Sequence, residues 1–191
     1  LYVLFVGGRL GLRAGELAHL DERWINWNRS IIEIPQHWEC EKGENGQVCG
    51  YCRKAAEQAV EHDDELSMGE ALADRWNPKT TNNARAVPFD FDHRVETDLE
   101  AFFDEHTEFA SSRATVNRRV DRVLDAAGYP VGSCWPHALR ATAATYHAYR
   151  GVDVVPLQAM FGWADLATAR KYIRLSGGAT QRALRETHAE A

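Results

Sequence analysis

The sequence contains no long hydrophobic run and no recognisable targeting segment. Its apolar opening, residues 1–6, stops at Gly7-Gly8-Arg9, far short of the roughly 20 apolar residues that cross a bilayer. The basic lead and the small-residue cleavage site of a signal peptide are also missing. We therefore expect a cytoplasmic protein with no membrane partner.

A net positive charge is missing as well, which at first sight argues against a nucleic-acid partner. The formal net charge is −6, and only four lysines accompany 18 arginines, a bias that salt adaptation and GC-rich coding both produce. The charges are unevenly distributed, however. Residues 1–110 hold 11 basic and 22 acidic side chains, whereas residues 111–191 hold 11 basic and six acidic ones. We therefore expect a polyanion to bind to the C-terminal part.

The apolar content is sufficient for one buried core. The 191 residues are 45% hydrophobic and 26% charged, which excludes a disordered chain and fits a single globular domain. Residues 1–20 predict helical core turns separated at Gly7-Gly8. Trp24–Trp27 and Ile31–Ile34 predict a hairpin, and Arg85–Phe89 predicts a third strand at an edge or an end of the sheet, because it contains a proline.

After residue 91 the pattern becomes helical. The expected helices are Glu96–Phe109, Thr115–Ala127, His137–Arg150, Val154–Phe161, Asp165–Leu175 and Ala179–Glu190. Residues 35–75 are too long for an ordinary hairpin loop and predict an insertion with its own structure, including a polar helix over Arg53–Leu66. The expected fold class is mainly α with a small antiparallel three-stranded sheet (α+β).

Several residues have the chemistry of a phosphate site. His137 and Arg140 stand three residues apart after Pro136, so they share one face at the start of a helix, where an anion is favoured. Arg13 stands three residues before Glu16, and a carboxylate can hold a guanidinium in place for a phosphate oxygen. Solvated surface pairs are the alternative for both.

Two further candidates are a lysine and a tyrosine. Lys79 lies at the turn into the expected third strand, where an ammonium can act as a point charge or a general acid. Tyr172 lies between cations in Thr168-Ala169-Arg170-Lys171-Tyr172-Ile173-Arg174, and nearby positive charge favours the phenolate needed for nucleophilic attack. Core packing is the alternative for a single tyrosine.

The ordered set is more specific than its parts. Arg13 in GLRAGEL, Lys79 before Arg85-Ala86-Val87-Pro88, His137-x-x-Arg140, Phe161-Gly162-Trp163 and Tyr172 follow one another along the chain. This order resembles the catalytic domain of the tyrosine recombinases, the phage-integrase family, over nearly all of residues 1–191 outside the expected insertion.

The resemblance implies a role for each residue in a site-specific recombinase. Arg13 and Arg140 would hold the scissile phosphate, Lys79 would protonate the leaving 5′ oxygen and His137 would assist proton transfer. Trp163 stands where many members carry a second histidine and would donate its indole N–H. Tyr172 would attack to form a 3′-phosphotyrosyl bond, and Glu16 would orient Arg13 or a neighbour. The reaction would need neither ATP nor a catalytic metal.

The resemblance also implies partners. Members act as tetramers on double-stranded DNA, and the C-terminal segment, here Ala179 onward, docks on a neighbour. The family's N-terminal DNA-clamping domain is missing, and we expect that the chain was excised from a longer protein. A type IB topoisomerase with the same chemistry is a minor alternative. A zinc-containing DNA-binding or assembly module without catalysis is the alternative from a different class.

Cysteines form a second motif inside the expected insertion. His37-x2-Cys40-x8-Cys49-x2-Cys52 has the spacing of a zinc knuckle, and a structural zinc would let this short segment fold. His37 is the expected fourth ligand, with His62 or a water as substitutes. A disulfide is disfavoured in a reducing cytoplasm, free thiols are the other alternative, and Cys134 is expected to be a buried thiol apart from the motif.

Overall fold

The computed structural model describes residues 2–73, 76, 84–109 and 112–189. Its helices are α1 (Tyr2–Phe5), α2 (Ala14–His19), α3 (Gly50–His62), α4 (Met68–Ala73), α5 (His93–Phe103), α6 (Arg113–Ala126), α7 (Pro136–Arg150), α8 (Val154–Phe161), α9 (Leu166–Ser176) and α10 (Gly178–Ala189). A π-helical turn, η1 (Val6–Leu10), follows α1, and 3₁₀ turns are η2 (Glu22–Trp24), η3 (Trp27–Arg29) and η4 (Glu44–Gly46).

The small sheet is antiparallel and confirms the expected fold class. Its strands β1 (Ile25–Asn26), β2 (Ile31–Ile34) and β3 (Arg85–Pro88) lie in the order β1-β2-β3. Ile32 pairs with Ile25 on one side and with Val87 on the other. Pro88 therefore lies on an outer strand, where its missing N–H costs no ladder hydrogen bond.

Several boundaries differ from the sequence-based expectation, and two of them have a clear physical reason. The chain stays helical through Gly7-Gly8 and ends its turn at Gly11, which adopts the left-handed conformation with φ of 66°. Glycine in a helix costs only about 1 kcal/mol, so neighbouring packing overrides it. The helix expected at Glu96–Phe109 ends at Phe103 and begins earlier, at His93. It begins there because the Asp92 carboxylate caps the first turn by accepting from the Arg94 N–H.

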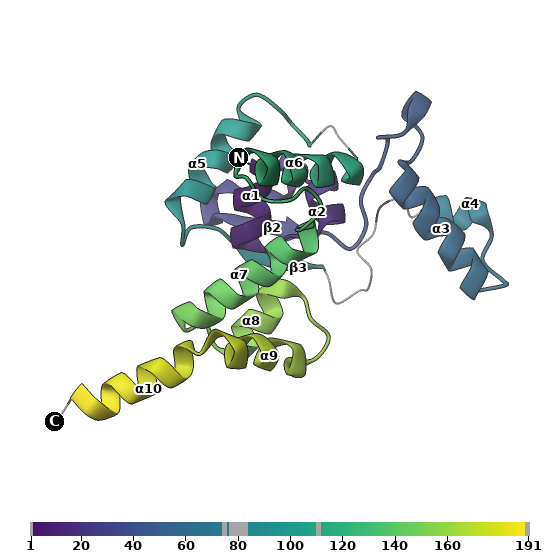
Figure 1. The fold of residues 1–191 in the computed structure, drawn as a ribbon. Helices are drawn as coiled ribbons and strands as arrows, with labels where there is room; N and C mark the ends of the chain where they lie inside the picture. The colour runs from purple at the N-terminus through teal and green to yellow at the C-terminus, as the bar shows by residue number, and fades with distance from the viewer. Residues whose placement is uncertain (1, 74–75, 77–83, 110–111, 190–191) are drawn as a thin grey trace.

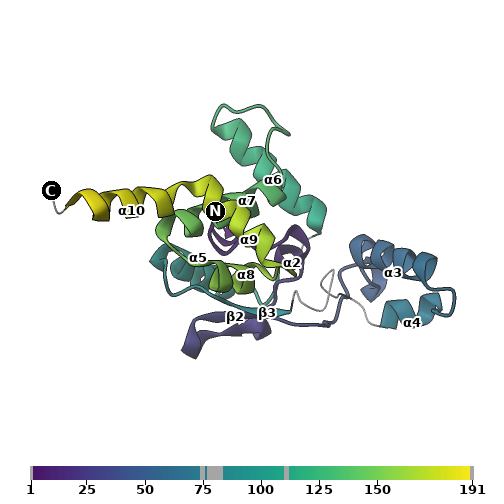
Figure 2. The ribbon, with the colours of Figure 1, turned by 90° about the horizontal axis from the view of Figure 1, so that it is seen from below.

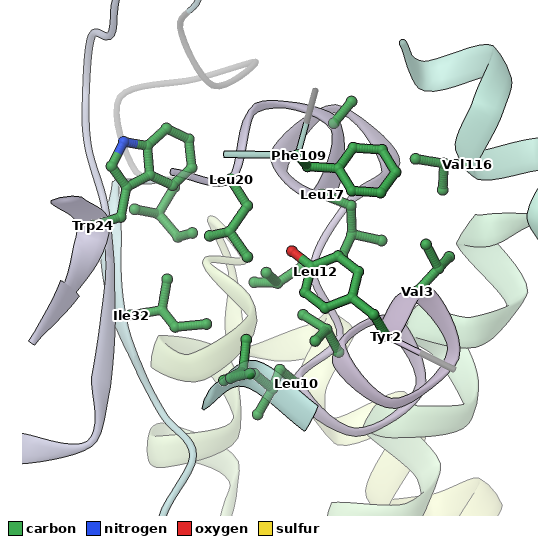
Figure 3. Packing of buried hydrophobic residues seen from close by; sticks show 14 of the residues in the cluster. Tyr2, Val3, Leu10, Leu12, Leu17, Leu20, Trp24, Ile32, Phe109 and Val116 are labelled. Atoms are coloured by element: carbon green, nitrogen blue, oxygen red, sulfur yellow. The ribbon is translucent and has the colours of Figure 1, made fainter. Parts of the chain in front are cut away.

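The main core lies between the N-terminal helices, the sheet and α5 and α6. Figure 3 shows side chains from α1, η1, α2, β2 and α6 that converge in this core. Its labelled members are Tyr2, Val3, Leu10, Leu12, Leu17, Leu20, Trp24, Ile32, Phe109 and Val116. A second cluster, made of Ala143, Ala144, Ala148, Leu157, Phe161 and Ala169, joins α7, α8 and α9.

The segment from residue 40 onward leads to a helical pair at the side of the body. α3 and α4 pack on each other, and in both views they lie at the opposite end from α10, which projects toward the C-terminus (Figures 1 and 2). The expected polar helix begins and ends earlier, at Gly50–His62. Within the described ranges, no helix is long and apolar enough to cross a membrane.

Candidate active site and metal cluster

Arg13 is placed by the junction before α2. It is the N-cap of that helix, with extended backbone angles, rather than a residue inside it. The Glu16 carboxylate accepts hydrogen bonds from the Arg13 backbone N–H at 2.7 Å and from its Nη1 at 2.9 Å. This double contact fixes both the start of α2 and the direction of the guanidinium.

Glu16 also binds a second arginine, whose role the sequence did not indicate. Arg85 at the start of β3 donates from Nη1 and Nη2 to the two carboxylate oxygens at 2.8 and 3.0 Å. Its Nε donates to the Met160 carbonyl at 2.7 Å. Arg85 thereby ties β3 and α8 to α2. A charged residue at an inward position of a short strand is the only local signal for this contact.

The charge of Glu16 is stabilised by these neighbours. Burial by itself would raise the pKa of the carboxyl group, but the neighbouring guanidiniums, Arg85 first, lower it to about 2. Glu16 is 2% exposed, so a negative charge there depends on these partners. Three guanidiniums, those of Arg13, Arg85 and Arg140, act on this one carboxylate, which leaves positive charge for an anion to neutralise.

Arg140 lies in the first turns of α7 and is almost fully buried. Its Nη1 donates to the Gly11 carbonyl at 2.6 Å, and its Nη2 donates to the Phe161 carbonyl. A guanidinium carries five N–H donors, so these bonds leave donors for a ligand. Burial, and then repulsion by Arg13, lower the pKa of Arg140 to about 9, so it remains protonated at neutral pH.

A cleft of about 700 Å³ brings most of the expected site residues together. Its lining residues are Arg13, Ala14, Gly15, Glu16, Tyr51, Trp76, Arg113, Asn117, Trp135, Pro136, His137, Arg140 and Trp163. His137 is exposed at the start of α7, where helix N–H groups favour an anion. The cleft thus combines Arg13, His137, Arg140 and Trp163 from three separate parts of the chain.

Tyr172 lies beside the cleft on α9. Its ring stacks on the Trp163 indole with a centroid distance of 5.1 Å and an interplanar angle of 5°. Trp163 in turn stacks on Phe161 at 4.7 Å, and the Arg140 guanidinium carbon lies 5.8 Å from the Trp163 ring centre. The aromatic stack therefore places Tyr172 next to the residues that surround Arg140.

Lys79 lies outside the described residues, in the range 77–83. Trp76, three residues before Lys79 in the sequence, is described and lines the cleft. The Trp76 backbone N–H donates to the Trp38 carbonyl at 3.1 Å, and Trp38 returns the bond at 2.8 Å. These two bonds hold Trp76 itself at the wall of the cleft.

A cluster of potential metal ligands lies at the C-terminal end of α2. The ligand atoms of His19, Cys40, Cys49 and Cys52 lie within 4.8 Å of one another, and all four residues are buried. The expected fourth ligand, His37, does not belong to this group, and neither does His62, which is exposed on α3. His19 takes the place because α2 points it into the core, toward the three thiols.

The distances within the cluster match a tetrahedral metal site. His19 Nε2 lies 3.5, 3.6 and 3.4 Å from the Sγ atoms of Cys40, Cys49 and Cys52, and the last two sulfurs are 3.7 Å apart. Zinc bonds of about 2.3 Å to sulfur and 2.0 Å to nitrogen imply separations of roughly 3.5 Å between sulfur and nitrogen and 3.8 Å between sulfurs.

Hydrogen bonds orient the potential ligands. His19 Nδ1 lies 2.7 Å from the Gly15 carbonyl, so Nδ1 carries the proton and Nε2 is free to bind a metal. The Cys49 N–H donates to the Cys40 sulfur at 3.4 Å. All four cysteines of the chain are free thiols, and Cys134 is half-buried rather than buried as expected.

Comparisons with known proteins agree with this fold. Residues 6–177 match the model of the phage integrase family. The chain is 28% identical over 127 residues to tyrosine recombinase XerC of Chlamydia caviae, covering 64% of this chain and 39% of that protein. The corresponding protein of Chlamydia pneumoniae is 27% identical, with 64% and 40% covered. The chain thus spans about two fifths of the length of these relatives.

Solved structures show the same fold. The crystal structure of XerA recombinase has a TM-score of 0.59 and 19% sequence identity, with 98% of this chain and 55% of that chain covered. The Tn1549 transposon integrase in complex with transposon right end DNA has a TM-score of 0.61 and 15% identity, with 96% and 58% covered. The expectation that an N-terminal domain precedes this chain stays a prediction.

Proposed function

The chain belongs to the phage integrase family, and from this premise we propose that residues 1–191 are the catalytic domain of a site-specific DNA recombinase. The domain cleaves and rejoins DNA strands through a 3′-phosphotyrosyl intermediate. The observation that carries the proposal is the cleft where Arg13, His137, Arg140 and Trp163 meet, with Tyr172 stacked on Trp163 beside it.

The electrostatics of the cleft fit a phosphodiester. Burial lowers the pKa of Arg140 most, and repulsion by Arg13 lowers it further. A phosphate between the two guanidiniums would offset this repulsion. Preorganised positive groups lower the barrier most where negative charge develops in the transition state. Arg13 and Arg140 therefore bind the non-bridging oxygens, and His137 adds a donor at the start of α7.

The reaction proceeds in two balanced transfers. The Tyr172 hydroxyl gives its proton to His137, its oxygen attacks phosphorus, a new P–O bond forms, and the bond to the 5′ oxygen breaks. Lys79 gives that oxygen its proton. A 5′-hydroxyl of a second strand then attacks the same phosphorus and gives its proton back to Lys79, while the Tyr172 oxygen leaves and regains its proton from His137, so bond energy is conserved without ATP. Glu16 and Arg85 hold Arg13 in place, and Trp163 supports Tyr172.

A covalent adduct tests this function. The full chain is incubated with a nicked duplex library of randomised sequence, and DNA that stays bound to protein in SDS is measured. We expect an adduct with the wild type and none with Tyr172→Phe, because only the phenol oxygen can form the ester. Tyr129→Phe, an exposed tyrosine outside the cleft, is the matched control. Absence of an adduct from the wild type would favour the non-catalytic zinc-containing module.

We propose double-stranded DNA as the partner and a tetramer on DNA as the active assembly. Residues 111–191, the part of the chain with a net positive charge, include α6 and α7. These helices contribute Arg113, His137 and Arg140 to the cleft. DNA affinity should fall steeply with salt because bound phosphates release counterions; a flat salt response would contradict this binding face.

The free thiols fit a reducing compartment, and we place the reaction in the cytoplasm.

We further propose that His19, Cys40, Cys49 and Cys52 hold one structural zinc, which attaches the insertion spanning residues 35–75 to α2. Three sulfurs and one imidazole nitrogen at tetrahedral separations are a common zinc donor set. Metal analysis of the purified chain should find one zinc per chain, retained in His37→Gln. A content well below one zinc, in a preparation free of chelators, would remove the metal from the proposal.

A further inference from the structure

The metal cluster and the phosphate-binding cleft share one short helix. α2 carries Arg13 at its N-cap, Glu16 in its first turn and His19 at its last residue. Six residues at about 1.5 Å each make the helix roughly 9 Å long. Arg13 and His19 therefore lie at the two ends of the same short helix.

The cluster also builds one wall of the cleft. Tyr51 stands between the ligands Cys49 and Cys52 and lines the cleft. Its ring lies against Gly15 of α2, where a Cβ would come within 3.3 Å of it. Trp76, another lining residue, stacks on the His19 ring with a centroid distance of 5.3 Å. The His19 ring also lies 6.2 Å from the Tyr51 ring between centroids, so the imidazole is next to two side chains that shape the site.

α2 has little stability of its own. A helix of six residues is far below the length at which helices persist in water, so its position depends on its ends and its buried face. One end is fixed by the contacts of Glu16 with Arg13 and Arg85. His19 lies at the other end, where its Nε2 faces the buried sulfur atoms of Cys40, Cys49 and Cys52, and Lys42 Nζ donates to the Ala18 carbonyl at 2.9 Å.

We propose that a metal ion bound by His19, Cys40, Cys49 and Cys52 positions Arg13 for phosphate binding by fixing α2 and the Tyr51 wall. DNA strand cleavage then depends on this metal, although the metal takes no part in the chemical steps. His19 is a positioning residue. The inference rests on the proposed recombinase function and extends it to a metal requirement.

The test separates His19 from the metal. In His19→Gln the three thiolates keep the zinc, while α2 loses its bond to it; His37→Gln is the matched control. We expect the variant to retain zinc, and we expect amide hydrogen exchange of Leu17, Ala18 and residue 19 to become at least tenfold faster, with α9 unchanged. The rate of adduct formation should fall about 100-fold, as expected for a catalytic group displaced by about 1 Å, with the DNA dissociation constant within about threefold.

A second measurement uses the wild type stripped of zinc by a chelator and then reloaded. Faster exchange in α2 after stripping, reversed by one equivalent of zinc, supports the proposal. Wild-type exchange and cleavage in His19→Gln would overturn it. Loss of helical circular dichroism in both samples would also overturn it, because the metal would then support the whole fold. If the zinc-loaded wild type forms no adduct, the proposed recombinase function is wrong. The hydrogen exchange of α2 then still tests whether the metal fixes the position of this helix.

Discussion

Glu16 shows how one buried residue organises the site. It accepts hydrogen bonds from Arg13 and Arg85, and these contacts are possible because its charge is stabilised on all sides. A carboxylate in such a position is strongly destabilising when a partner is lost. The residue therefore combines two tasks, since it holds Arg13 and it joins α2 to β3 through Arg85.

Acid should weaken the fold through this residue. The pKa of Glu16 is about 2 in the folded chain, below its ordinary value of 4.5, so the folded state binds fewer protons. Its contribution to stability is therefore complete above pH 4.5 and is lost as the pH falls toward 2, by on the order of 3 kcal/mol. Urea unfolding between pH 2 and 7 measures it. Glu16→Gln should show a flatter profile; an equally steep profile would contradict the assignment.

Arg140 has a structural task beside its expected catalytic one. Arg140→Ala should slow adduct formation by about 100-fold or more, as expected when a transition-state donor is removed. It should also lower the free energy of unfolding by about 1–3 kcal/mol, because the Gly11 and Phe161 carbonyls lose a donor. Adduct kinetics and chemical denaturation check the two effects. Arg150→Ala, an exposed arginine on the same helix, should change neither; a fully stable Arg140→Ala would contradict the buried contacts.

Among the elements, the junction between η1 and α2 sets the direction of Arg13. Gly11 has a φ of 66°, and a Cβ added there would come within 2.4 Å of the Phe161 ring. Only glycine is free of both the backbone strain and the clash. The packing of α8 against this turn therefore requires a glycine two residues before Arg13.

Gly11→Ala should lower the free energy of unfolding by more than about 2 kcal/mol, combining strain and overpacking. It should also reduce adduct formation, since Arg13 follows the junction. Thermal denaturation and the adduct assay measure the two effects. Gly8→Ala is the matched control, because a Cβ at Gly8 meets nothing within 4 Å and alanine favours a helix. Equal stability of the two variants would show that the junction is not strained.

Across the whole molecule, α10 stands out as a twelve-residue helix that packs only its first turns against α7 and α9. It projects away from the body (Figure 1), and Gly178 is its only buried residue among those described. Arg182 Nη1 donates to the Tyr149 carbonyl at 2.7 Å, while Leu184 is 55% exposed. A polar helix with an exposed leucine fits a docking arm for a neighbouring subunit.

Deletion of residues 179–191 should leave folding intact and prevent tetramers from forming on DNA. The reason is that the helix contributes few buried contacts within its own chain. Light scattering of protein–DNA complexes measures assembly, and circular dichroism measures folding. Leu184→Glu should weaken assembly in the same direction without shortening the chain. Unchanged assembly after the deletion would remove α10 from the interface.

Local signals allowed the sequence to predict several elements well. α8 lies at the predicted Val154–Phe161, because Asp153 caps its start and Gly162 ends it in the left-handed conformation. The three strands and the fold class are also confirmed, because short apolar and β-branched runs marked the strands in the sequence. The order of Arg13, His137, Arg140, Trp163 and Tyr172 also predicted a common site, and all but Tyr172 line one cleft. Their chemical roles stay predictions.

By itself, the sequence thus determined the helices with strong caps, the strands of the small sheet and the family motif, since caps and strands follow local patterns and the motif is an order of short segments along the chain. Only the tertiary structure decided that His19 replaces His37 in the cluster and that Arg85 binds Glu16. His19 and Cys40 are 21 residues apart in the chain, and Glu16 and Arg85 are 69 residues apart. Distance in space, set by core packing, selects a metal ligand or an ion-pair partner.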